Sequence, residues 1–185
     1  MKRIAEQDLI LADTGPFCRL AEAGEAHLDA AALYLEPNVQ VVIDVHKELR
    51  RRSTVSVHAR LTRLELLGVP REEPITITDK NLLDRVEAIL QGRRRRKPGH
   101  EREDRGEVTT ALVAADLGVP VLMDDGFGKR LAAQEGVEIF TTQDLAVELA
   151  AYDALRSLHA YGLYRIVYQN SNRREFDRLV DAARP

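Results

Sequence analysis

Four short apolar segments, separated by stretches with helical patterning, constrain the fold more than any other feature of the sequence. The segments are residues 8–12, 39–44, 119–123 and 137–140. Each is short and apolar, and several are rich in Val and Ile, as strands buried on both faces of a sheet are. Short buried strands that alternate with helices predict an α/β fold, a mostly parallel central sheet with helices on both faces.

Turn and cap residues predict where the helices begin and end. Pro16 is suited to open a helix that Gly24 interrupts, and Asp44 to cap the helix that carries Glu48. Thr78 and Asp79 are suited to cap a helix that ends near residue 90. Further helices are expected over 55–68, 105–117, 129–134, 143–158 and 173–185, a basic loop over 91–104, and a strand at "LYRIVY", residues 163–168.

Length and composition suit a single domain with an appendage. The chain has 185 residues, of which 44% are hydrophobic. We expect one domain over residues 1–145 and a C-terminal helical extension over 146–185, packed on that domain or docking a partner. The single cysteine, Cys18, excludes an internal disulfide and fits a cytoplasmic protein. Neither a membrane-spanning helix nor a signal peptide is expected, and the net charge of -3 leaves nucleic-acid binding to local charge.

Acidic residues gather at strand ends and in the first turns of helices. Those after strands are Asp13, Asp124 and Asp125, and those near helix starts are Glu48, Asp104 and Glu107. Because sites in parallel sheets form at the carboxyl ends of strands, we expect these acids to converge on one edge of the sheet. Clustered carboxylates repel one another unless a cation lies between them, and oxygen ligands select Mg²⁺ or Mn²⁺. No Cys/His cluster in the sequence suggests zinc.

The ordered set of acidic motifs resembles the PIN-domain ribonucleases. The matching segments are "LILADTGPF", "VHKELR", "EDRGEVTTALVAADLGVPVLMDD" and "GKRLA", which span roughly residues 8–145. The resemblance implies a PIN-like three-layer sandwich in which four acids are catalytic: Asp13, Glu48, Asp104 and Asp125. It implies a metal site drawn from Asp13, Asp104, Glu107, Asp124 and Asp125. Many members are VapC-type toxins that cut RNA and are silenced by a small antitoxin protein.

Each acid also has an ordinary structural explanation. Asp13 suits a turn, and Glu48 can pair with Arg51 or Arg52 along a helix. Asp104 and Glu107 are spaced as a capping box, and Asp124-Asp125-Gly126 suits a tight turn. Their occurrence together, in the order of the family, favours the functional interpretation.

Positive charge is concentrated just before Asp104. The run consists of Arg93, Arg94, Arg95, Arg96 and Lys97, and Lys129 and Arg130 follow the last acidic pair. Such residues can contact an RNA backbone, although a solvated loop or an antitoxin contact would also explain the run.

The sequence therefore predicts an endoribonuclease that uses Mg²⁺ or Mn²⁺ to activate water against RNA phosphodiesters. Its expected partner is RNA, with a small antitoxin and a second copy of the chain left open. The alternatives are a non-catalytic PIN-fold module that binds RNA or a protein, and a phosphatase or nucleotide-binding protein. Asp13-Thr14-Gly15 is not the Asp-x-Asp of a phosphatase, and neither glycine-rich nucleotide motif is present.

Overall fold

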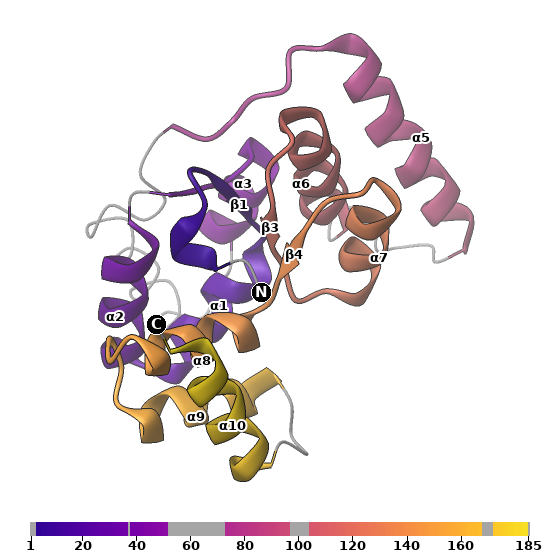
Figure 1. The fold of residues 1–185 in the computed structure, drawn as a ribbon. Helices are drawn as coiled ribbons and strands as arrows, with labels where there is room; N and C mark the ends of the chain where they lie inside the picture. Colours follow the sequence, from indigo (N-terminus) through magenta and orange to yellow (C-terminus); the bar gives the residue numbers. More distant parts are fainter. Residues whose placement is uncertain (1–2, 37, 52–72, 97–103, 168–171, 185) are drawn as a thin grey trace.

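The computed structural model describes residues 3–36, 38–51, 73–96, 104–167 and 172–184 (Figure 1). Its strands are β1 (Ile10–Ala12), β2 (Val39–Gln40), β3 (Val121–Leu122) and β4 (Ile139–Phe140). Its helices are the 3-10 helix η1 (Ile4–Glu6) and the α-helices α1 (Thr14–Ala23), α2 (Glu25–Leu35), α3 (Ile43–Arg51), α5 (Lys80–Arg96), α6 (Asp104–Leu117), α7 (Gly126–Gln134), α8 (Thr142–Ala151), α9 (Ser157–Val167) and α10 (Arg173–Ala183).

The four strands form one parallel sheet in the order β2-β1-β3-β4. Leu11 on β1 pairs with Gln40 on β2 and with Val121 on β3, and Val121 also pairs with Ile139 on β4. The strands are shorter than the apolar segments that predicted them, but each falls inside its segment. The chain therefore has the α/β fold with a parallel sheet that the sequence predicts.

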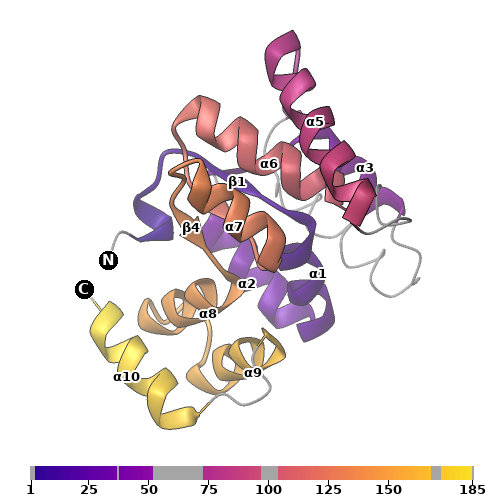
Figure 2. The ribbon, with the colours of Figure 1, turned by 90° about the vertical axis from the view of Figure 1, so that its right-hand side faces the viewer.

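Helices cover both faces of the sheet. Figure 2 shows α6 and α7 on one side of β1 and β4, and α1, α2 and α8 on the other. Helix α6 packs against β1 and β3, and α3, α5 and α7 pack against α6. The middle of this three-layer arrangement is fully buried, as Leu11, Leu112 and Leu122 show. All four strands run the same way, so residues that follow them lie at a single edge.

Four local expectations are wrong. Helix α5 extends to Arg96, so residues 91–96 are helical rather than a loop. Asp44 lies inside α3, one residue after its start, and is not its cap. The segment 163–167 belongs to helix α9 and forms no strand, and the helix expected over 143–158 ends at Ala151. The helix expected over 55–68 lies outside the described residues.

The last two helices, α9 and α10, lie within the predicted C-terminal extension. Both α9 and α10 pack against α8, and α9 also packs against α1. The expected boundary at residue 145 falls within α8, and the division into two units stays a prediction. Among the described residues, no helix has the length and apolar character needed to span a membrane.

Candidate functional site at the carboxyl edge of the sheet

Asp13 is the most deeply buried acid at the edge where the strands end. It follows β1 directly, it is 3% exposed, and its Oδ1 has no hydrogen-bond partner among the described residues. Burial raises its pKa to about 7, the backbone N–H groups of Thr14 and Gly15 act in the opposite direction, and the nearby charges of Glu48 and Asp125 raise it further. One oxygen of the Asp13 carboxyl group is therefore left unsatisfied by the described protein neighbours.

Glu107, in the first turn of α6, is in the same situation. Its Oε2 is buried and has no hydrogen-bond partner in the part of the chain that the structure describes. Burial is the main cause that raises its pKa to about 9, followed by the charges of Asp13, Asp125, Asp104 and Glu48. These mutual electrostatic effects show that five of the six predicted acids lie near one another.

Glu48 reaches this group from α3 because α6 carries a glycine at the contact. A Cβ placed on Gly106 would lie 3.2 Å from Glu48 Oε2 and 3.7 Å from Asp13 Oδ1. Thr14 Oγ1 donates a hydrogen bond to Glu48 Oε2 over 3.0 Å. Gly106 thus lets α3 and β1 bring two carboxylates against the start of α6.

Asp125 and Asp104 belong to the group but already have protein partners. Asp125 caps α7, where its Oδ1 accepts from the N–H groups of Phe127 (2.6 Å) and Gly128 (2.9 Å). Asp104 accepts two hydrogen bonds from Arg93, 2.7 Å from Nε and 3.0 Å from Nη2. Asp125 keeps its other oxygen outside the cap, whereas Arg93 engages both oxygens of Asp104.

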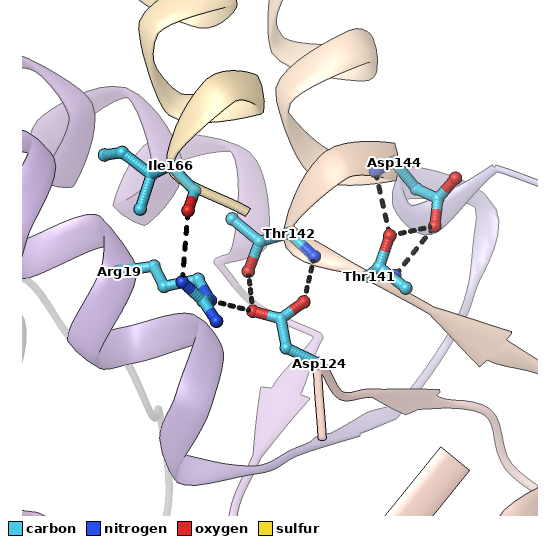
Figure 3. Close-up of polar contacts among 6 residues, drawn as sticks. All are labelled: Arg19, Asp124, Thr141, Thr142, Asp144 and Ile166. Atoms are coloured by element: carbon cyan, nitrogen blue, oxygen red, sulfur yellow. Dashed lines mark hydrogen bonds and ion pairs between the residues drawn. The ribbon is translucent and has the colours of Figure 1, made fainter. Parts of the chain in front are cut away.

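Asp124, which follows β3, is held by residues of α1 and α8 in the hydrogen-bond network of Figure 3. Its Oδ1 accepts from Thr142 N–H (2.9 Å), and its Oδ2 accepts from Thr142 Oγ1 (2.7 Å) and Arg19 Nε (2.9 Å). Arg19 also donates to the carbonyl oxygen of Ile166, 3.4 Å away. In this arrangement Asp124 joins β3 to α1 and α8, and its oxygens are engaged.

A pocket of about 370 Å³ opens among these side chains. Its lining consists of Asp13, Thr14, Gly15, Cys18, Arg19, Glu22, Glu48, Glu107, Asp124, Asp125 and Gly126. Five of the six predicted acids line the pocket, and Asp104 borders the same acidic group. In this arrangement, no three acidic, His or Cys side chains of the described residues surround a point where a metal ion could sit.

The predicted RNA-binding residues divide into three groups. Arg93 lies against Asp104 and stacks its guanidinium 3.8 Å from the ring centre of Phe127. Lys129 and Arg130 lie on α7, next to the Asp125 cap. Arg94, Arg95 and Arg96 occupy the end of α5, and Lys97 lies outside the described residues.

Sequence reasoning missed the polar residues that organise the pocket. Arg19 is the one basic residue in its lining among the described residues, and Thr14 and Thr142 each donate a hydroxyl to an acid. The one signal for Arg19 is its position as the sole basic residue on the otherwise largely apolar helix α1. Thr14 follows Asp13, and Thr142 lies two residues after the end of β4. Side chains at both positions can reach the edge of the sheet where the strands end.

Comparison with known proteins adds no relative. Neither a family model, nor a curated protein, nor a solved structure matches the chain.

Proposed function

We propose that the chain is a metal-dependent endoribonuclease with a PIN-like fold. The observation that carries the proposal is that Asp13 and Glu107 line one pocket, each with a buried carboxyl oxygen that has no partner. A buried polar group without a partner costs folding free energy, and two such acids side by side cost more. A divalent cation between them removes that cost, so the donor set fits Mg²⁺ or Mn²⁺.

Asp13, Glu107 and Asp125 would hold the ion, and because their side chains do not surround one point in the described structure, they would have to close around it. Glu48 lies beside them, and Asp104 would join the set only by releasing Arg93. When bound, the ion supplies an activated water and offsets the charge that develops on the phosphodiester. Glu48 is oriented by Thr14, and a carboxylate in this position can accept the proton of the attacking water. Arg19, fixed by Asp124, places positive charge in the pocket where a phosphate would enter. The expected products carry a 3′-hydroxyl and a 5′-phosphate.

The experiment is cleavage of total RNA by the purified chain with Mn²⁺, with Mg²⁺ and with EDTA. Cleavage should require the ion and should be lost in Asp13→Asn. Asp116→Asn is the matched control, because Asp116 is an exposed acid on α6 that lies outside the pocket. Cleavage that persists in EDTA or in Asp13→Asn would overturn the proposal.

The resemblance to VapC-type proteins extends this proposal to one half of a toxin–antitoxin pair. A small neighbouring reading frame whose product binds the chain and stops the cleavage would support that extension. If the neighbouring protein has no effect on cleavage, the nuclease proposal stands but the toxin–antitoxin extension does not.

A second candidate is a PIN-fold module that binds RNA without cutting it. Arg93 engages Asp104, and Thr142 and Arg19 engage Asp124, so two of the six acids are already neutralised by the protein. Titration with Mn²⁺ distinguishes the candidates. RNA binding by a chain that takes up no Mn²⁺ would favour the module.

A further inference from the structure

A second pocket, of about 350 Å³, lies between α5 and α7. Its lining from α5 is Ala88, Ile89, Gly92 and Arg93, and its lining from α7 is Phe127, Arg130, Leu131 and Gln134. We call it the α5–α7 groove.

The groove combines an apolar, aromatic wall with positively charged side chains. Ile89, Leu131 and Phe127 provide an apolar and aromatic wall, and two arginines and Gln134 provide polar groups. Arg93 is clamped between the Phe127 ring and the Asp104 carboxylate, so its planar guanidinium is fixed. A fixed guanidinium beside an aromatic ring is a surface on which a nucleobase stacks.

The groove is joined to the acidic pocket by two contacts. Arg93, in the groove lining, holds Asp104 of the acidic group. Arg130 Nη1 lies 3.5 Å from the place of a Cβ on Gly126, and Gly126 lines the acidic pocket. Arg130 forms no ion pair within the parts of the chain that the structure describes, which leaves its guanidinium available to an anion between the two pockets.

Gly92 leaves the α5 wall of the groove without a side chain at this position. A glycine in a helix interior is less favourable than an alanine. No described atom lies within 4 Å of the place of its Cβ, so packing against another element does not require a glycine there. An open surface at this position leaves room for a ligand on the helix.

We infer that the α5–α7 groove binds one nucleotide of a single-stranded RNA next to the bond that is cut. The base lies against Arg93, Phe127 and Leu131, and its phosphate lies on Arg130 at the border of the acidic pocket. The inference rests on the proposed function for the neighbouring bond, but nucleotide binding in the groove needs no metal.

The test is the affinity of a fluorescently labelled six-nucleotide RNA, measured in EDTA by anisotropy. Gly92→Phe fills the groove and should weaken binding about tenfold, the effect of losing one stacked base. Gly92→Ala is the matched control and should bind within about twofold of the wild type, since a methyl group leaves the groove open. Phe127→Leu keeps an apolar side chain, removes the ring, and should also weaken binding.

Arg130→Gln should weaken the same RNA and reduce the salt slope of its log affinity by roughly 0.7, the value of one single-strand phosphate contact. The exposed Arg178→Gln on α10 is the control for charge alone. Unchanged affinity in Gly92→Phe, no RNA binding by the wild type, or binding of a mononucleotide but not of the RNA would each overturn the inference.

Cleavage assays on the same variants separate the two proposals. If Gly92→Phe loses RNA binding and the wild type cuts no RNA, the groove is a nucleotide site and the nuclease proposal is wrong. If the wild type cuts RNA in a metal-dependent way and Gly92→Phe binds RNA unchanged, the nuclease proposal stands and the groove is not the nucleotide site.

Discussion

Asp13 illustrates how a proposed metal-binding residue can oppose folding. Its carboxyl group is buried beside Glu48 and Asp125, and one of its oxygens has no partner. Without a metal, the folded state must either protonate this group or keep it charged among like charges, and both cost free energy.

Asp13→Asn should therefore melt at the same or a higher temperature than the wild type in EDTA at pH 8. The amide removes one charge from the cluster and keeps nearly the same shape. A gain of about 1 kcal/mol would raise the melting temperature by about 2–4 °C in a chain of this size. Thermal unfolding followed by circular dichroism is the measurement, and a steep fall would identify Asp13 as a structural cap.

The pH dependence of stability follows from the same two acids. The pKa of Asp13 is raised from 3.8 to about 7, and that of Glu107 from 4.5 to about 9. The folded state thus binds these protons more tightly than the unfolded state, so the metal-free protein gains stability as the pH falls from above 9 toward 7. The gain continues below pH 7 until the unfolded-state pKa values are reached.

His27 affects stability in the opposite direction. Burial lowers its pKa from 6.5, so the unfolded state binds a proton on this side chain more readily than the folded state, and stability falls as the pH drops through this range. The comparison between pH 9 and pH 7 therefore isolates the acids. Urea unfolding at these two pH values is the measurement, and Glu107→Gln should flatten the difference. An equal difference in the variant would contradict the assignment to Glu107.

At the scale of elements, the Arg93–Asp104 pair fastens α5 to the start of α6. Arg93→Gln should lower the free energy of unfolding by about 1.5–3 kcal/mol, because it leaves a largely buried carboxylate without its charged partner. It should also raise the affinity for Mn²⁺, since a competing cation is gone. Calorimetry measures both quantities.

Arg85→Gln is the matched control on the same helix. The Arg85–Glu135 pair is more exposed, with 51% and 26% of the two side chains accessible, and such pairs contribute about 0–1 kcal/mol. Equal losses in the two variants would mean that the Arg93 pair acts only as a surface contact.

The end of α5 carries a separate prediction, because Arg94, Arg95 and Arg96 directly follow Arg93, which contacts Asp104 of the acidic group. Replacing these three with Ser should reduce the salt slope of RNA affinity by roughly 0.7 for each RNA phosphate that the variant no longer neutralises. Metal binding should not change. RNA affinity across a salt series is the measurement, and an unchanged slope would place the RNA path along Lys129 and Arg130 instead.

The elements that the sequence predicts correctly are those with local signals. The four apolar segments each contain a strand, and Asp79 caps α5 through the N–H of Leu82. In each case a few neighbouring residues decide the conformation, which is the information that a single sequence contains.

The errors come from contacts between distant segments. Residues 163–167 include the strand-favouring Tyr164, Ile166 and Val167, yet Ala160, Leu163 and Tyr164 form a buried helical face on α9. The partner of Asp104 is Arg93, eleven positions away, and Asp124 is held by Arg19 and Thr142. Local patterns identify the acids but give no information on which of them the protein itself neutralises.

For the whole molecule, the site joins segments that are far apart in the chain. Asp13 follows β1, Glu48 comes from α3, Glu107 from α6, and Asp125 from the start of α7. An ion bound by these groups in the folded state alone would tie the end of β1 to α3, α6 and α7.

Mn²⁺ or Mg²⁺ should therefore raise the melting temperature of the wild type. At a concentration one hundred times the dissociation constant, the stabilisation is about 2.7 kcal/mol. Binding should also release protons from Asp13 and Glu107, with their raised pKa values. Differential scanning calorimetry in metal and in EDTA is the measurement, and Asp13→Asn should show a smaller shift. A wild type indifferent to both ions would contradict the metal site.

The unpartnered oxygens of Asp13 and Glu107 also have a consequence for protein engineering. A screen that rewards heat resistance alone, or a design score that sums folding energies, will replace these two acids early, because the apo protein gains from losing them. A thermostable version that is meant to keep the proposed metal site has to hold both positions fixed. Its gains have to come from remote sites, such as the exposed Gly162 in the interior of α9, where alanine meets no described neighbour.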